Sequence, residues 1–377
     1  MEAGTDRYVA RPVAGLDRLP TPAFLVFVEA VEANVRNAIE LVGGVDHWRP
    51  HVKTVKSRAV MAMLLANGVR RFKCATPLEL LELCAVGAPD VLLAYQPVGP
   101  MVERVAAIAA AHPGTRISVL TESPELVSHW SGTPVSLFLD LDVGLERTGI
   151  PLDDDARIRA TLDAIAAAGI ELRGLHLYAS DLHIADARAR VRALHRAYDR
   201  VVALTDALLA GGIAMEEIAT AGTPALRGSI DYRGFDALPL AHRHGAGTIV
   251  FGDRRSLSEP GIRSGFQPAA VVLSRVIGRT VPGRVVCDAG HKSVSADAGV
   301  PTCEVVGHPH WRALAPNEEH LPLDVATDPA PGYGTLLRLV PTHVCPTTNL
   351  YDQVAFVRGS QLACIDPLPA RGHELHA

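Results

Sequence analysis

A lysine near the start of the chain stands where it could act as a nucleophile. In the run WRPHVK at 48–53, Arg49, His51 and Lys53 are spaced two apart, so along a strand their side chains share one face. If that face lines a barrel interior, burial disfavours the ammonium form of Lys53 and makes the amine more nucleophilic. Such an amine suits Schiff-base chemistry with a carbonyl cofactor. The structural alternative is a lysine that reaches solvent at a strand end, and the residue type alone favours it.

A second pair of reactive side chains lies near the other end of the chain. His343 and Cys345 are two residues apart, so on an extended segment both project to the same side. Imidazole and thiolate are nitrogen and sulfur ligands that zinc favours. Two protein ligands would leave coordination positions open for water or substrate, as a catalytic metal requires. The alternative is a core histidine beside a buried free cysteine, and the pair alone favours that alternative.

Three further side chains follow strand-like runs. Arg147 comes shortly after the run at 135–141 and could pair with a phenolate or a carboxylate. Tyr178 ends the run LRGLHLY and could pack near a ring, and His183 follows it as a candidate acid or base. A charge pattern at a helix start and a surface loop are the structural alternatives for these positions.

Two short glycine and threonine motifs come late in the chain. Gly222 and Thr223 form one of them, and Gly247 and Thr248 belong to the other. Small residues with free backbone N–H groups suit a phosphate cradle, and late loops are the usual phosphate site of parallel barrels. Each motif is weak by itself, because Gly-Thr turns are common.

The segment from 20 to 255 contains the elements that must position most of these residues. Short β-branched runs alternate there with stretches of helical periodicity. Strands are expected at 24–27, 48–53, 70–75, 90–95, 116–120, 135–141, 172–178, 217–221 and 248–251, and helices at 29–41, 57–67, 77–86, 101–112 and 185–210. About eight βα units predict an α/β fold with a closed (β/α)8 TIM barrel. An open doubly wound sheet is disfavoured, because no GxGxxG follows the first strand.

The segment from 256 to 377 has a different pattern. Proline and glycine are frequent, and short apolar runs occur at 271–278, 284–290, 335–341 and 354–359. This pattern predicts a smaller, mostly β domain, and residues 1–19 are expected to pack with it.

Composition limits the class of protein. The 377 residues are 48% hydrophobic and 20% charged, which is typical of a globular chain. A formal net charge of −5 on a mixed surface gives no reason to expect nucleic acid or an anionic membrane as partner. We find no apolar run of ~20 residues and no secretory signal pattern. Six scattered cysteines without a CxxC pair indicate a reducing cytoplasm.

Taken together, the motifs resemble the D-threonine aldolase and D-serine dehydratase group of fold-type III pyridoxal-phosphate enzymes, which are alanine racemase-like. The matching pieces run in family order from about residue 21 to about residue 359. They are RPHVKT at 49–54, KCAT at 73–76, LDLDVGLERTG at 139–149, GTP at 222–224, VFGD at 250–253, DAGHKSVS at 288–295, NEEH at 317–320 and PTHVCPTTNLYD at 341–352. The ordered set favours the functional interpretation of Lys53, His343 and Cys345 over the structural one.

The resemblance implies a role for each candidate residue. Lys53 would form the internal aldimine with pyridoxal 5′-phosphate, and His183 would be a further catalytic residue. The other cofactor-binding residues would be His51, Arg147, Tyr178, Gly222, Thr223, Gly247 and Thr248. His343 and Cys345 would bind a divalent metal, with zinc favoured and manganese or magnesium as alternatives. The family's active site forms between two subunits, so the resemblance implies a homodimer.

Two reactions of a D-β-hydroxy-α-amino acid remain open. In a dehydratase, Lys53 removes the α-proton, the metal assists loss of the β-hydroxyl, and a keto acid and ammonia result. In an aldolase, a base takes the hydroxyl proton and the Cα–Cβ bond breaks to give glycine and an aldehyde. His-x-Cys is typical of the D-serine dehydratases, whereas the aldolases usually carry His-x-Asp, so dehydration is favoured. More distant alternatives are an amino-acid racemase and a non-catalytic cofactor-binding barrel.

Overall fold

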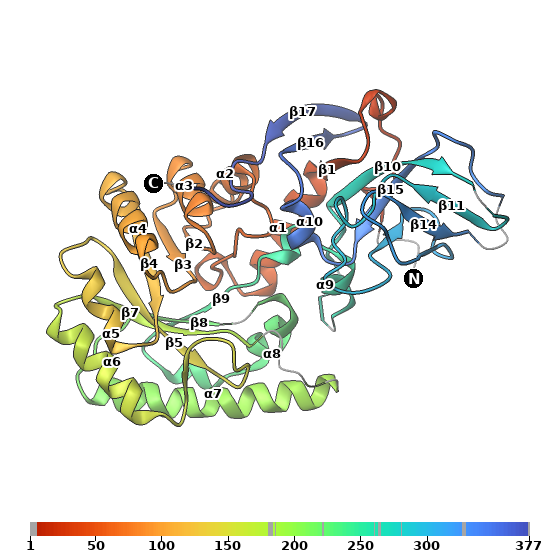
Figure 1. Cartoon of the computed structure of the whole chain (residues 1–377). Coiled ribbons are helices and arrows are strands. Elements are labelled where there is room, and N and C mark those ends of the chain that lie inside the picture. The colour runs from red at the N-terminus through yellow and green to blue at the C-terminus, as the bar shows by residue number, and fades with distance from the viewer. Residues whose placement is uncertain are drawn as a thin grey trace. The chain divides into compact units, whose positions relative to one another are not determined.

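The computed structural model divides into two compact units. The first contains Met1–Ala38, Thr54–Met63 and Thr248–Ala377, and the second contains Ile39–Lys53 and Leu64–Gly247. The residues that the structure describes are 6–179, 184, 186–220, 222–259, 261–262, 265–279, 281–325 and 329–375 (Figure 1). No helix among these residues is long and apolar enough to cross a membrane.

The second unit is the expected parallel barrel. Its strands, in spatial order, are β2 (Arg71–Cys74), β3 (Asp90–Leu93), β4 (Arg116–Thr121), β5 (Ser136–Asp142), β7 (Leu172–Leu177), β8 (Glu217–Thr220) and β9 (Ala241–His244), with β6 (Ile150–Pro151) beside β5. Every neighbouring pair is parallel. Parallel bridges from Trp48 to His244 and from His51 to Lys73 join the segment 48–51 to both edge strands. The sheet therefore closes into a ring, and the predicted barrel is confirmed.

Helices connect the barrel strands and cover their outer face (Figure 1). They are α3 (Pro77–Ala85), α4 (Pro100–Ala111), α5 (Pro124–Val127), α6 (Asp155–Ala167), α7 (Ala187–Ala210) and α8 (Leu226–Asp231). The side chains of Thr76, Asp154 and Asp186 accept hydrogen bonds from backbone N–H groups in the first turns of α3, α6 and α7. These caps satisfy donors that a helix start leaves free, so the helices begin where the sequence provides a cap.

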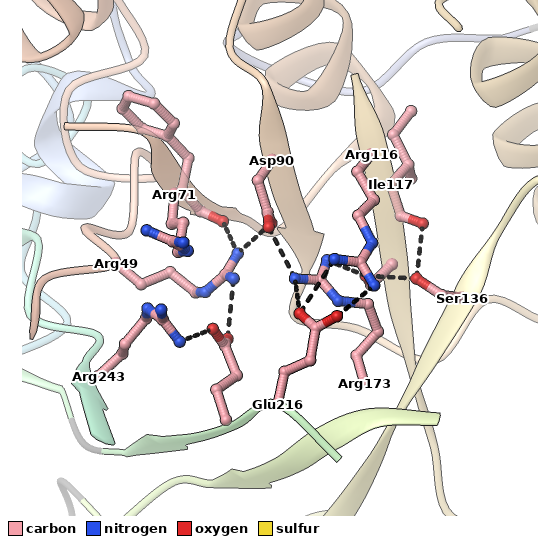
Figure 2. Close-up of polar contacts among 12 residues, drawn as sticks. Arg49, Arg71, Asp90, Arg116, Ile117, Ser136, Arg173, Glu216 and Arg243 are labelled. Atoms are coloured by element: carbon pink, nitrogen blue, oxygen red, sulfur yellow. Dashed lines mark hydrogen bonds and ion pairs between the residues drawn. The ribbon is translucent and has the colours of Figure 1, made fainter. Parts of the chain in front are cut away.

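Charged residues close the barrel at the N-terminal ends of its strands (Figure 2). Asp90, the first residue of β3, accepts hydrogen bonds of 2.7 Å from Arg49 and 2.7 Å from Arg173. Glu217, the first residue of β8, forms ion pairs with Arg49 and Arg243. We call the whole set the N-terminal charge layer; its members are Arg49, Asp90, Arg116, Glu171, Arg173, Glu216, Glu217 and Arg243.

The first unit is mostly β, as expected for the C-terminal part of the chain. Its strands are β1 (Ala23–Phe27), β10 (Ala270–Gly278), β11 (Arg284–Cys287), β12 (Cys303–Val305), β13 (Arg312–Ala313), β14 (Leu321–Asp324), β15 (Leu336–Pro341), β16 (Gln353–Arg358) and β17 (Gln361–Pro367). The remaining α-helices are α1 (Val28–Leu41), α2 (Arg58–Ala66), α9 (Arg254–Ser258) and α10 (Val344–Thr348).

Three sequence expectations differ from the structure. The strand expected at 24–27 exists as β1, but it pairs with β10 and β16 rather than with the barrel. The compact units therefore do not follow a single boundary at residue 255. The strand expected at 248–251 is wrong, because Thr248–Val250 form a 3-10 helix. The run at 48–53 keeps only its two isolated bridges and then turns.

Candidate active site

Lys53, Tyr178 and Arg147 meet at the C-terminal end of the barrel strands. Lys53 lies in the turn that follows the bridge at His51, and its Nζ is 5.9 Å from the centroid of the Tyr178 ring. The guanidinium carbon of Arg147 is 4.3 Å from the same centroid. Tyr178 directly follows β7, and Arg147 lies in the loop after β5. The structure thus brings together three of the predicted site residues, with two cations beside one aromatic ring.

His51 holds the turn that carries Lys53. Its Nδ1 accepts a hydrogen bond of 3.3 Å from the backbone N–H of Lys53. Its backbone is paired with that of Lys73 in β2. The position of Lys53 is therefore tied both to the barrel edge and to the neighbouring imidazole.

A buried triad that the sequence analysis does not anticipate lies inside the barrel. Lys73 Nζ is 2.8 Å from His176 Nε2, and His176 Nδ1 is 2.6 Å from Asp140 Oδ1. Lys73, His176 and Asp140 are 2%, 3% and 5% exposed. Asp140 is an acceptor when ionised, so His176 donates from Nδ1 and accepts from Lys73 at Nε2. We call these three residues the Lys73 triad.

Lys73 and His176 have pKa values that differ from those of the same groups in water. Burial is the largest cause, followed by the charge of Lys53, and together they lower the pKa of Lys73 to about 7. Burial and the charge of Lys73 also lower the pKa of His176, so the neutral imidazole is favoured. A buried amine that changes charge near neutral pH is unusual in a structural core and is typical of functional sites.

The predicted phosphate-binding residues have the properties that an anion requires. Thr223 begins a short 3-10 helix, and its Oγ1 is buried without a hydrogen-bond partner among the described residues. Gly247 is also buried, and a Cβ built there would collide with the carbonyl oxygen of His51. Only glycine therefore fits at Gly247. Gly222 precedes the 3-10 helix of Thr223, and Thr248 belongs to the other compact unit.

In the first unit, His343 contacts both Cys345 and an aspartate. His343 lies at the N-terminal cap of α10 and Cys345 within that helix, so the segment is not extended as expected. His343 Nδ1 is 2.6 Å from Asp297 Oδ2. Cys345 Sγ is 3.0 Å from Thr54 Oγ1 and 3.4 Å from Thr248 Oγ1. Asp297 is 46 residues before His343, so spacing gives no signal for it.

The contacts of His343 make its imidazole more basic than usual. Burial lowers the pKa of His343, but its contacts with Cys345 and Asp297 outweigh burial and raise this pKa to about 9. Within the described ranges, no group of three or more His, Cys, Asp or Glu residues is arranged to hold a metal ion. His343 and Cys345 are donors of the kinds that a soft divalent metal prefers, and Asp297 contacts the imidazole.

One predicted catalytic residue cannot be placed. His183 lies outside the described residues, as does Ala221 beside the phosphate-binding motif. The proposed roles of both positions stay predictions.

The chain is similar to known proteins over most of its length. Residues 26–240 match the model "Alanine racemase, N-terminal domain", and residues 269–357 match "Putative serine dehydratase domain". A D-threonine aldolase from Arthrobacter sp is 29% identical over 373 residues, which is 96% of each protein. A D-threo-3-hydroxyaspartate dehydratase from Delftia sp. (strain HT23) is 25% identical and covers 87% of this chain and 92% of the relative.

A solved structure agrees with these relatives. The crystal structure of D-threonine aldolase from Filomicrobium marinum has a TM-score of 0.83 and 26% identity, and the match covers 96% of this chain and 98% of that one. The relatives are lyases, and the family implies pyridoxal phosphate as cofactor. The resemblance drawn from the motifs and the expected enzyme class are thereby confirmed. The chain belongs to the alanine racemase N-terminal domain family and, within it, to the D-threonine aldolase and D-serine dehydratase group of fold-type III pyridoxal-phosphate enzymes.

Proposed function

We propose that this chain is a pyridoxal-phosphate- and divalent-metal-dependent lyase that removes water from D-β-hydroxy-α-amino acids to give a keto acid and ammonia. One observation carries the choice of dehydration. His343 interacts with a thiol, Cys345, in a chain whose barrel also holds Lys53 beside Tyr178 and Arg147. His-x-Cys is the pair that the motif comparison associates with D-serine dehydratases.

The residues around Lys53 fit the cofactor. The phosphate needs hydrogen-bond donors, and the buried Thr223 hydroxyl lacks a partner among the described residues. The phenolate needs a cation, which Arg147 can provide, and the pyridine ring needs an apolar surface, which Tyr178 can provide. When bound, pyridoxal phosphate withdraws electrons from the α-carbon of the amino acid. Lys53 would hold the cofactor covalently and Gly222, Gly247 and Thr248 would complete the phosphate site.

The same chain supplies the proton acceptor. With pyridoxal phosphate bound, the Lys53 amine would serve as the base that takes the α-proton. His51 keeps Lys53 in place through the hydrogen bond to its backbone N–H. By fixing the backbone that carries it, His51 limits where the Lys53 amine can act as a base.

His343 and Cys345 would hold the metal. A divalent ion there would polarise the β-hydroxyl and make it a better leaving group. The donor set favours zinc over manganese or magnesium, because thiolate is a soft ligand. Asp297 would keep the His343 ring oriented by accepting the proton of Nδ1.

Retro-aldol cleavage to glycine and an aldehyde is the second candidate. The relative that is 29% identical over 96% of the chain is named D-threonine aldolase, which favours this reaction. It requires a base for the substrate hydroxyl, and His183 is the residue that the sequence offers.

The proposal also includes the oligomeric state of the protein and its place in the cell. We expect a homodimer, which light scattering on the eluting protein would show as twice the mass of the 40.1 kDa chain. The six cysteines all lie within the described residues and form no disulfide there, which supports a reducing cytoplasm. A monomer that is active at the lowest measurable concentration would contradict the dimer.

The reaction is tested by product analysis with the purified protein. D-serine, D-threonine and D-threo-3-hydroxyaspartate are each incubated with added pyridoxal phosphate and zinc, and the L-isomers serve as controls. Keto acid and ammonia should form from the D-isomers and disappear after chelation, whereas glycine would identify the aldolase. If no D-isomer yields either keto acid or glycine, the proposed lyase activity is wrong.

Two variants sharpen this assay. His343→Ala should retain the bound cofactor and lose turnover, because the proposed metal ligand is gone. Lys292→Ala is the matched control, since Lys292 is exposed and pairs with Glu318 and Glu319. Unchanged turnover in His343→Ala would contradict the metal site while leaving the cofactor site intact.

A further inference from the structure

The Lys73 triad has no part in the reaction proposed above, yet it is built into the same end of the barrel as Lys53. Lys73 is the third residue of β2, and His176 and Asp140 are each the fifth residue of their strands, β7 and β5. The hydrogen bonds of 2.8 and 2.6 Å run without a gap from the amine through the imidazole to the carboxylate. Thr148 Oγ1 donates to the other oxygen of Asp140 at 3.2 Å.

The polar partner of the Lys73 amine in this triad is a neutral imidazole. Burial and the nearby ammonium favour the neutral form of His176, whose Nδ1 proton is already committed to Asp140. A lysine cation that is 2% exposed is therefore balanced by Asp140 only through an intervening ring. Burial without a direct counter-ion disfavours the ammonium form.

The other charged groups that act on Lys73 are mostly cations. Lys53, Arg49 and Arg147 disfavour a positive charge at Lys73, and Asp140 favours it. Arg147 acts in the same direction on His176. Arg49 is paired with Asp90 and Glu217. Lys53 and Arg147 against Asp140 therefore leave an excess of positive charge beside Lys73 until an anion enters.

We propose that the Lys73 triad is a proton-uptake device: in slightly alkaline solution Lys73 is mostly neutral in the ligand-free barrel, and it takes a proton from solvent when the anionic cofactor binds. The inference rests on the proposed cofactor site. Lys73 is then a positioning residue, because its ammonium group offsets negative charge that the cofactor brings into the barrel. The proton ends on Lys73 Nζ, and His176 continues to accept a hydrogen bond from it.

Binding of an anion should cause proton uptake, rather than release, at Lys73. An anion raises the pKa of a nearby amine, so Lys73, which has a pKa of about 7 in the empty barrel, gains a proton on binding at pH 7.5. Uptake should be about half a proton or more per site at this pH. It should vanish well below pH 7, where the amine is already charged.

Calorimetry measures this uptake directly. Pyridoxal 5′-phosphate is titrated into the ligand-free protein at pH 7.5 in two buffers with different enthalpies of ionisation, and the difference in heat gives the protons exchanged. The wild type and Lys292→Met should take up the same number. Lys73→Met and Lys73→Arg should each take up about half a proton less, and Lys73→Arg should retain affinity because its charge is permanent.

The experiment separates a failure of the triad inference from a failure of the proposed cofactor site. If the wild type binds the cofactor but Lys73→Met and Lys73→Arg exchange as many protons as the wild type, the triad inference is wrong and the cofactor site stands. If the wild type does not bind pyridoxal phosphate, both fail. Where the variants do not fold, the wild type alone decides: its proton uptake should peak between about pH 7 and pH 9, and a count that does not vary with pH would overturn the inference.

Discussion

The two ends of the barrel use charge in opposite ways. At the N-terminal ends of the strands, arginines and carboxylates alternate in the N-terminal charge layer, and Asp90 binds Arg49 and Arg173 at 2.7 Å each (Figure 2). Towards the C-terminal ends, Lys53 and Arg147 act on the buried Lys73, with Asp140 as the opposing carboxylate.

The difference separates structural charge from functional charge. In the N-terminal charge layer, Arg49, Arg173 and Arg243 each have a carboxylate partner, so their charges are paired without a ligand. A group of cations that exceeds its carboxylates is stabilised only when an anion arrives. Substitutions should therefore affect folding at one end and ligand binding at the other.

The largest expected effect is at Lys53. Lys53→Ala should abolish the yellow absorbance of the bound cofactor and lower turnover by at least about 10²–10⁴, because the chain loses both its covalent attachment point and its base. The midpoint of urea unfolding should stay close to that of the ligand-free wild type. Absorption spectra and denaturation curves test this, with Lys292→Ala as control. A retained band would refute the assignment of Lys53.

Arg49 should give the opposite result. Arg49→Met leaves Asp90 and Glu217 without one of their cations in a site where Arg49 is fully buried. Breaking a buried ion pair in this way costs about 3–5 kcal/mol of unfolding free energy. Urea denaturation of the ligand-free protein measures the loss. A change below about 1 kcal/mol would mean that the charge layer is dispensable for folding.

The pH dependence of stability should show the contribution of the N-terminal charge layer. Burial raises the pKa of Asp90, but the charges of Arg49 and Arg173 outweigh burial and lower this pKa to about 2. The Asp90 carboxyl has a higher pKa in the unfolded chain. Its contribution of about 2 kcal/mol to the free energy of unfolding is therefore complete above about pH 4 and is lost as the pH falls towards 2. Asp90→Asn should remove this part of the acid sensitivity. Identical acid curves for the two proteins would contradict the assignment.

The smallest effect is expected at the phosphate site. Thr223→Val keeps the side-chain volume but removes a buried hydroxyl that has no partner in the described structure. Binding of pyridoxal phosphate should weaken by about 1 kcal/mol, or roughly fivefold, while the stability of the ligand-free protein stays the same or increases. Titration of the ligand-free protein measures the affinity. Loss of stability without loss of affinity would show that Thr223 is only structural.

Much of the barrel could be predicted from the sequence because its strands are apolar and its helices are periodic. The runs that became β3, β4 and β5 were predicted within a few residues. The strand β9 was missed because its sequence, AHRH, is polar. The run at 24–27 was assigned to the wrong sheet, because a buried apolar strand carries no information about which sheet it joins.

The site was predictable only where a motif marks it. Lys53, Tyr178 and Arg147 follow strand-like runs, and the structure brings them together. The Lys73 triad gives no such signal as a group. The motifs at 73–76 and 139–149 contain Lys73 and Asp140, but nothing in the sequence predicts that they meet His176 inside the barrel. Asp297 also gives none, since contact with His343 depends on tertiary folding rather than on spacing.

The central claim is that Lys53 is the amine that binds pyridoxal phosphate. The most direct test is to reduce the loaded protein with borohydride, digest it, and locate the pyridoxyl group by mass spectrometry. The account predicts a single modified peptide with the group on Lys53. Modification of Lys56 or Lys73 instead, or no modified lysine at all, would contradict it.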